Sequence, residues 1–215
     1  MSGFKRIVSA ISKDLEERLP RQRATQRRKL SELVAGMLVC QTPNLMELSN
    51  VLDRPTESAE ARYNYVERFL KNPLVDIQVV MSAFAEDLLK RLMVHQHTLV
   101  LMIDQSKVND TLDVLMVSVR LRKRAVPLFW LVKETKGGIG FNEQKTLLET
   151  VLKWLPEGCR PMLAGDRFYV VKWDWVTPTS LDGYFSVLLL RSSEKDLLKS
   201  IRMDLLHSRS FYGVL

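Results

Sequence analysis

Two aspartates have the setting that metal-dependent phosphoryl transfer requires. Asp104 follows the apolar run 98–103, and Asp166 follows the shorter apolar run 161–164. Two carboxylates held close together repel each other unless a cation lies between them, and two Mg²⁺ ions about 3.5–4 Å apart can activate an attacking oxygen and stabilise a leaving one. Taken alone, each aspartate is as readily a helix cap or a turn residue. The pair therefore has a function only if the fold brings it together.

The elements that must position this pair are predicted as strand–strand–strand–helix–strand. Runs rich in Val, Leu, Phe and Trp indicate strands over residues 98–103, 112–120, 125–133 and 161–164. A polar hairpin turn, 121–123, joins the second and third strands, and a helix over 142–155 precedes the fourth. Such crossovers are right-handed in about 98% of cases. If the fourth strand lies parallel to the first, Asp104 and Asp166 converge at the same edge of the sheet.

The first part of the chain predicts helices. An amphipathic helix starts at Leu30, with Leu33, Val34, Met37 and Leu38 on its inner face. Asn44 with Glu47 has the spacing of a capping box for the next helix. Further helices are expected over 57–70 and 76–93. Three short helices with tight turns and basic flanks resemble a helix-turn-helix DNA-binding module, whose reading helix would be 57–70.

Basic residues gather where such a module would meet DNA. Between residues 18 and 29 there are six basic and no acidic residues. The predicted reading helix places Arg62, Asn64, Arg68 and Lys71 off its core side. A plain helical bundle with a solvated charged face fits the same pattern. A second basic group, Arg120, Arg122, Lys123 and Arg124, lies at the hairpin turn, where it either contacts phosphate or is solvated.

Composition narrows the classes of partner. The chain has a net charge of +7 and a pI near 9.5, which favours nucleic acid. No apolar run approaches the roughly 20 residues of a membrane helix, the N-terminus does not have the pattern of a secretory signal, and Cys40 and Cys159 form no metal-ligand spacing. We therefore expect a cytoplasmic protein with no membrane partner. Asp110 and Asp113 are expected to serve the turn after the first strand, with a supporting role behind the metal-binding acids as the alternative.

Several stretches, in this order and spacing, resemble the start of the catalytic domain of the insertion-sequence-four family of DDE transposases. They are Leu99-Val-Leu-Met-Ile-Asp104-Gln-Ser, Leu115-Met-Val-Ser-Val-Arg120, Arg124-Ala-Val-Pro-Leu-Phe-Trp130, Lys136-Gly-Gly-Ile-Gly-Phe141-Asn-Glu-Gln144, Leu155-Pro-Glu-Gly158 and Gly165-Asp166-Arg-Phe-Tyr169. Arg27-Arg28-Lys29-Leu30, Asn44-Leu-Met-Glu-Leu48 and the segment 62–70 resemble the helical DNA-binding region of that family. The likeness covers about residues 20–169.

The resemblance implies an α+β or α/β chain. A helical DNA-binding region, 1–93, would precede 94–169, the first part of a ribonuclease H-like mixed sheet with flanking helices, and a divergent tail, 170–215. Asp104 and Asp166 would be the first two catalytic acids and would bind Mg²⁺ or Mn²⁺ in a two-metal site. The expected partner is transposon-end double-stranded DNA in the bacterial nucleoid, with a homodimer or mixing with full-length transposase. The residues expected to contact DNA are Arg21, Arg23, Arg27, Arg28, Lys29, Arg62, Arg68, Lys71, Arg122 and Lys123.

The third acid of that family, a Glu on a later helix, has no clear match. Only 49 residues follow Asp166, and Glu194 is the only Glu among them. Glu194 reads as a solvated residue at a helix start. Since the likeness stops at Tyr169, the tail is interpreted as out of frame, or else the domain is shortened. The chain alone is then expected to be catalytically weak or inactive. Two other functions stay open: a non-catalytic DNA-binding fragment that represses transposition, and a different ribonuclease H-like nuclease that acts on RNA.

Overall fold

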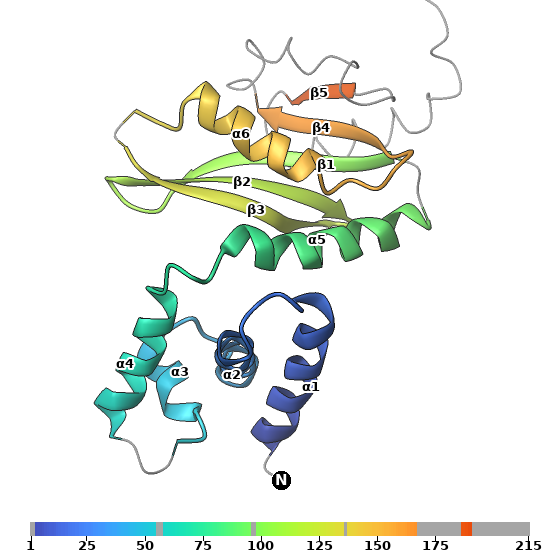
Figure 1. Ribbon diagram of the computed structural model, residues 1–215. Helices are drawn as coiled ribbons and strands as arrows, with labels where there is room; N and C mark the ends of the chain where they lie inside the picture. The colour runs from blue at the N-terminus through green and yellow to red at the C-terminus, as the bar shows by residue number, and fades with distance from the viewer. Residues whose placement is uncertain (1–2, 55–57, 96–97, 136, 167–185, 191–215) are drawn as a thin grey trace, which may run out of the picture. The chain divides into compact units, whose positions relative to one another are not determined.

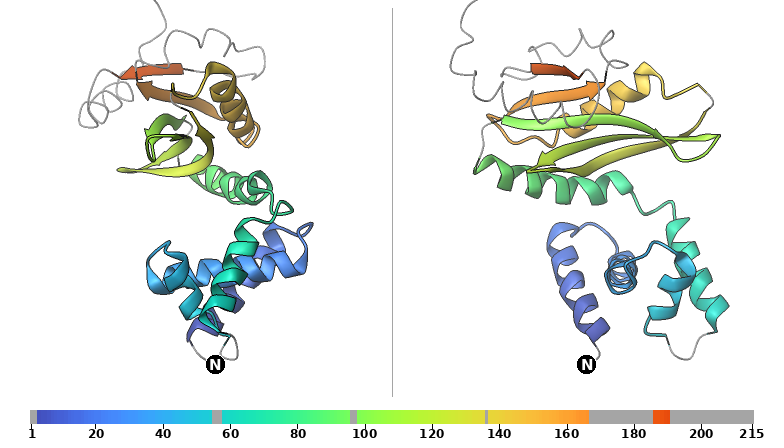
Figure 2. Two further views of the ribbon diagram at one scale, coloured as in Figure 1. Left: turned by 90° about the vertical axis from the view of Figure 1, so that its left-hand side faces the viewer. Right: turned by 180° about the vertical axis from the view of Figure 1, so that it is seen from behind.

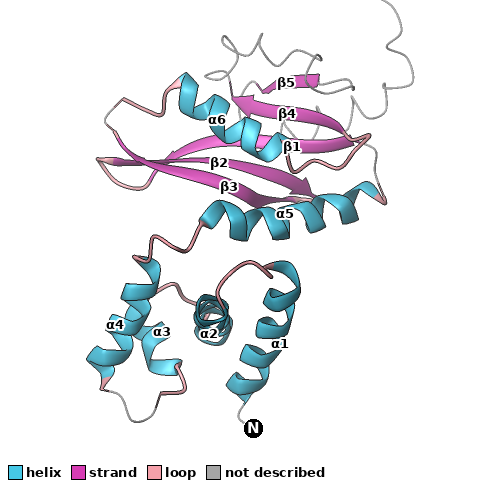
Figure 3. Ribbon diagram, in the orientation of Figure 1, coloured by secondary structure: helices cyan, strands magenta, loops and turns pink. Residues whose placement is uncertain are grey.

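The computed structural model describes residues 3–54, 58–95, 98–135, 137–166 and 186–190, over which the chain forms six helices and five strands (Figure 1). Two units divide between Phe84 and Ala85, inside a helix that continues to Met93. The boundary after residue 93 that the sequence predicts therefore falls later than the division between the units. A helical unit and a mixed α/β unit follow each other along the chain (Figure 3).

The helical unit contains the helices that the sequence predicts, together with one before them. The helices are α1 (Gly3–Arg18), α2 (Ala24–Cys40), α3 (Leu45–Val51), α4 (Ala59–Leu70) and the start of α5 (Ile77–Met93). Leu33, Leu52, Val66 and Phe69 form its core. The predicted cap of α3 is confirmed for Asn44, whose Oδ1 accepts hydrogen bonds from the backbone N–H groups of Met46 and Glu47 at 3.0 and 3.4 Å. The Glu47 half of the capping box is not formed, because the Asn44 N–H donates to Thr42 Oγ1 at 3.2 Å.

Helix α2 differs from the prediction in its start and in its inner face. It begins at Ala24 rather than Leu30, because nothing after Pro20 breaks a helix and a run of like charges does not prevent one. Met37 and Leu38, predicted to face inward, are 43% and 62% exposed. Helix α3 approaches α2 at Gly36, and Met37 and Leu38 are rotated by about 100° and 200° from that contact.

The second unit is built on a five-stranded mixed sheet. Its elements are β1 (Thr98–Lys107), β2 (Leu112–Leu121), β3 (Arg124–Glu134), α6 (Phe141–Leu152), β4 (Arg160–Asp166) and β5 (Ser186–Leu190). The strand order is β3-β2-β1-β4-β5. The first three strands pair antiparallel, whereas β4 lies parallel to β1 and β5 parallel to β4. The predicted succession of three strands, a helix and a strand is thus confirmed.

Alternation along β1 separates the two faces of the sheet. Leu99, Leu101 and Ile103 are buried on the face covered by α6 (Figure 2), whose Leu147, Leu148 and Val151 are buried in turn. Val100, Met102 and Asp104 point to the opposite face. The sequence places the end of this strand at Asp104, but β1 continues to Lys107, because β2 pairs with it as far as Asp113 opposite Lys107.

Candidate functional site

Asp104 and Asp166 lie on neighbouring parallel strands in the same register. Pairing of β1 with β4 runs from Thr98 opposite Arg160 to Met102 opposite Ala164, so each β1 residue is matched with the residue 62 positions later. Asp166 also lies 62 positions after Asp104. The last pair of β1 with β4, Met102 opposite Ala164, lies two residues before the two aspartates. The prediction that the first and fourth strands are parallel neighbours is confirmed.

Asp104 is an exposed carboxylate near the middle of the sheet. On its β2 side it lies opposite Met116. Ser106, two residues later on the same face, donates a hydrogen bond from Oγ to Asp104 Oδ2 at 3.3 Å. Among the described residues no lysine or arginine forms an ion pair with Asp104. Asp166 ends β4, where its backbone pairs with Leu190 of β5.

This arrangement fits a divalent cation held by oxygen ligands. Mg²⁺ in phosphoryl-transfer sites is often bound through only one or two carboxylates, and water and substrate phosphate fill the remaining positions. Asp104 is exposed and forms no ion pair with a lysine or arginine that the structure describes, so its carboxylate is open to such a cation. In the described part of the chain no three His, Cys, Asp or Glu side chains come together as a metal-binding group.

Gln105, the residue after Asp104, lies on the opposite face of β1 and forms two hydrogen bonds there. Gln105 Nε2 donates to Asp113 Oδ2 at 2.8 Å, and the backbone N–H of Ile139 donates to Gln105 Oε1 at 3.2 Å. Asp113 is a buried β2 residue with 2% exposure, so the prediction that it serves the turn is wrong. Its alternation with the buried Leu115 and Val117 in the sequence is the signal that could have placed it inside.

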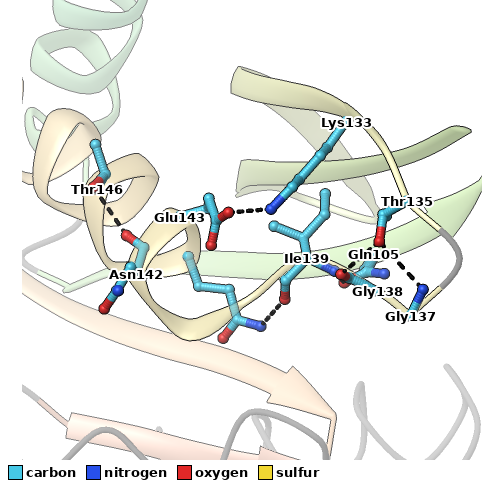
Figure 4. A network of polar contacts seen from close by, with 10 residues as sticks. Gln105, Lys133, Thr135, Gly137, Gly138, Ile139, Asn142, Glu143 and Thr146 are labelled. Carbon is cyan, nitrogen blue, oxygen red and sulfur yellow. Dashed lines mark hydrogen bonds and ion pairs between the residues drawn. The ribbon is translucent and has the colours of Figure 1, made fainter.

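The loop from β3 to α6 is thereby fastened behind the Asp104 strand (Figure 4). Thr135 Oγ1 donates to the backbone carbonyl of Gly138 at 3.2 Å, and Gly138 has a φ of 85°, a conformation that glycine adopts without strain. Lys133 of β3 forms an ion pair with Glu143 in the first turn of α6. The Lys133 ammonium, together with the backbone N–H of Glu143 itself, lowers the pKa of the Glu143 carboxyl. The hydrogen bond from Ile139 to Gln105 links this loop to the strand that carries Asp104.

Two of the predicted DNA contacts point into the protein instead. Arg27 Nη1 donates to the backbone carbonyls of Leu19 and Pro20 at 3.1 and 3.4 Å, and also to that of Gln22, so it closes the connection between α1 and α2. Arg62 Nε donates to the carbonyl of Ser49 at 3.0 Å, which joins α4 to α3. The expectation that Arg62 faces away from the core is therefore wrong, since its guanidinium satisfies a carbonyl of α3.

Other basic residues of the helical unit are exposed but paired within their own helix. Arg28 pairs with Glu32, Lys71 pairs with Glu67, and Arg68 Nε donates to the carbonyl of Asn64. The hydrogen bond and charge of Glu67 raise the pKa of Lys71. Arg21 and Arg23, in the connection before α2, are exposed as well.

A cationic cluster around Tyr65 was not anticipated from the sequence. Lys29 Nζ and the Arg54 guanidinium carbon lie 4.7 and 4.0 Å from the centre of the Tyr65 ring. The Tyr65 hydroxyl donates to Glu32 Oε2 at 2.8 Å, and burial together with this carboxylate raises the pKa of Tyr65. Lys29, predicted to contact DNA, thus packs on an aromatic ring, and Arg54 had no sequence signal because it lies in a helix break.

The predicted hairpin turn is confirmed as the two residues Arg122 and Lys123, since Leu121 pairs with Arg124 across it. Both turn residues are exposed. The predictions for the tail, including Glu194, concern residues of which only 186–190 are described.

Comparison with known proteins gives no match to a family model, a curated protein or a solved structure. Within the described residues no helix is both long enough and apolar enough to cross a bilayer. A functional interpretation therefore rests on the geometry of the chain itself.

Proposed function

We propose that this chain is a metal-dependent DNA transposase of the DDE type, with Asp104 and Asp166 as two of its catalytic acids. The observation that carries the proposal is the shared register of β1 and β4, in which a single offset of 62 positions relates both the paired strands and the two aspartates. Strand order supports it as well. Three antiparallel strands, a helix and two parallel strands in the order β3-β2-β1-β4-β5 agree with the ribonuclease H-like sheet that the family resemblance implies.

In this proposal the chain positions the phosphate of a DNA strand beside Asp104 and Asp166, which we name the acid pair. Asp104 and Asp166 would hold the cation, and Ser106 donates a hydrogen bond to the Asp104 carboxylate. When bound there, Mg²⁺ or Mn²⁺ supplies Lewis-acid activation of the attacking oxygen and stabilises the leaving oxygen. Water is the first nucleophile and a DNA 3′-hydroxyl the second. Gln105 and Asp113 keep β1 rigid behind the site.

A non-catalytic DNA-binding protein is the second candidate function. The exposed basic residues favour it, because Arg21 and Arg23 on the helical unit and Arg122 and Lys123 on the hairpin neutralise phosphates without any metal. Such a protein would occupy transposon ends and repress transposition. The two candidates differ in whether strand cleavage depends on the aspartates.

A nicking assay distinguishes them. The substrate is duplex DNA from the segments that flank the coding sequence, with Mg²⁺ or Mn²⁺, and the variants are Asp104→Asn, Asp166→Asn and the control Asp110→Asn, which changes an exposed aspartate outside the pair. The transposase proposal expects any cleavage by the wild type to be lost in the first two variants and kept in the third. Cleavage that persists in Asp104→Asn and Asp166→Asn would refute the site. Because the chain alone is expected to cleave weakly or not at all, the second candidate is supported only by DNA binding that is the same with and without Mn²⁺ and is unchanged in both variants.

A further inference from the structure

The turn between β2 and β3 concentrates positive charge. Arg120, Arg122, Lys123 and Arg124, which we name the hairpin cluster, place four cations within five residues, and the last three are exposed. None of the four forms an ion pair with an acid in the part of the chain that the structure describes. The exposed cations Arg28 and Lys71 differ from them, since each pairs with a glutamate four residues away along its helix.

The hairpin cluster is held on a rigid support. Pairing of β2 with β3 continues to Leu121 opposite Arg124, so only Arg122 and Lys123 form the turn. Arg120 Nε also donates to the backbone carbonyl of Arg122 at 3.0 Å, which ties the turn to the strand. A turn whose backbone is fixed before binding loses little backbone entropy when a ligand arrives. The cluster is therefore suited to bind a polyanion.

The backbone at Arg122 shows that folding does not favour arginine there. Its φ is 55°, in the left-handed region that glycine, asparagine and aspartate adopt most readily in two-residue hairpins. The Arg122 side chain is exposed, so burial offers no compensation for this strained conformation. The Arg122 side chain is therefore exposed at a turn position that other residue types adopt more readily.

The register also fixes how far the cluster lies from the acid pair. Asp104 is opposite Met116, and Arg122 lies six residues further along β2. At about 3.3 Å per residue this is roughly 20 Å. Because B-DNA advances 3.4 Å per base pair, roughly six base pairs of duplex span that distance.

We propose that the hairpin cluster binds the phosphate backbone of duplex DNA at a contact separate from the acid pair, about six base pairs away. This inference rests on the proposed function, since it takes the polyanion to be the DNA on which the acid pair acts. The cluster acts as an electrostatic clamp: its cations neutralise phosphates and release their counterions, and they recognise no base sequence.

The double variant Arg122→Gly with Lys123→Ser tests the clamp. Glycine relieves the left-handed backbone, so this variant keeps the fold, which thermal unfolding verifies. Binding to a mixed-sequence duplex of about 30 base pairs is followed by fluorescence anisotropy over a series of NaCl concentrations; the slope of log K against log salt is expected to become shallower by about 2, with a loss of affinity of roughly 50-fold at about 0.1 M salt. The control Lys145→Ser with Lys153→Ser removes the same charge from α6 and its C-cap residue and leaves both quantities unchanged.

The outcomes separate this inference from the function on which it rests. If the wild type binds duplex DNA and the cluster variant binds with the same affinity and slope, the clamp is refuted and the proposed function stands. Failure of the wild type to bind duplex DNA overturns both. Tighter binding to single-stranded RNA of equal length refutes duplex DNA as the ligand. Mn²⁺ binding is expected to be equal in the wild type and the cluster variant, and its loss in the variant would show that the cluster acts on the acid pair instead.

Discussion

Basic side chains have different partners in the helical unit and in the hairpin between β2 and β3. Arg27 and Arg62 donate to backbone carbonyls and so join helices, whereas Arg122 and Lys123 project from a two-residue turn and contact no acid among the described residues. Arg27 and Arg122 both lie in basic stretches of the sequence. The comparison teaches that the partners of a cation, and not its clustering, decide whether it is available to a ligand.

The largest effect on stability is expected from Arg27→Ala. This substitution removes one donor from three carbonyls at the α1–α2 connection, and hydrogen bonds from a charged donor contribute roughly 1.5–3 kcal/mol. We expect the free energy of unfolding to fall by about 2–3 kcal/mol in urea titrations. Arg28→Ala, the matched control, removes an exposed ion pair and is expected to cost at most about 0.5 kcal/mol. An equal loss of unfolding free energy in Arg27→Ala and Arg28→Ala would contradict the difference that we draw between an arginine bound to backbone carbonyls and one in an exposed ion pair.

Tyr65→Phe is expected to have an intermediate effect. It deletes the hydroxyl that donates to Glu32 and keeps the ring under Lys29 and Arg54, so the free energy of unfolding should fall by about 1 kcal/mol. Because the pKa of Tyr65 is raised in the folded state, this contribution is present below the ordinary tyrosine pKa and is lost as the pH rises above it. Chemical denaturation at neutral and strongly alkaline pH measures both points, and a difference that grows with pH would contradict the assignment.

Arg122→Gly alone is expected to change stability in the opposite direction. It removes a side chain from a left-handed backbone position, so the free energy of unfolding should rise by up to about 1 kcal/mol. DNA affinity should nevertheless fall by roughly tenfold at about 0.1 M salt. A marked loss of stability would mean that Arg122 supports the fold, as Arg27 does.

The smallest effect on stability is expected at the ion pair between Lys133 and Glu143. The pKa of Glu143 is lowered from its ordinary value of 4.5 by Lys133, so its contribution is fully present above pH 4.5 and is lost as the pH falls through the lowered folded value. Glu143→Gln should unfold slightly more easily than the wild type at neutral pH, and the two curves should converge in acid. A difference that persists in strong acid would rule out this charge effect.

The order and direction of the strands could be predicted from the sequence, whereas most of the side-chain contacts could not. Apolar runs and one crossover helix are enough to place the strand that ends at Asp166 parallel to the strand that carries Asp104, because few alternative topologies exist for such an order. The extension of β1 to Lys107 could not be predicted, because polar residues on both faces remove the apolar pattern while the hydrogen bonds to β2 continue.

The roles of individual arginines are harder to predict. An arginine that binds backbone carbonyls, as Arg27 and Arg62 do, looks in sequence like any exposed cation, because carbonyls are present at every position. Asp113 is different, since its alternation with buried Leu115 and Val117 marks it as an inward residue. In β2 the local pattern therefore predicts which face a side chain occupies, whereas in α2 and α4 it assigns Met37, Leu38 and Arg62 to the wrong face.

Mn²⁺ binding followed by electron paramagnetic resonance is the most direct test that Asp104 and Asp166 hold one cation between them. The wild type and the control Asp110→Asn are expected to bind Mn²⁺ equally. Asp104→Asn and Asp166→Asn should each weaken binding by at least about tenfold, because each removes a ligand. The double variant should lose little more than either single one, since one missing ligand already breaks the shared site. Wild-type affinity in both single variants would contradict the metal site and, with it, the chemistry proposed for this chain.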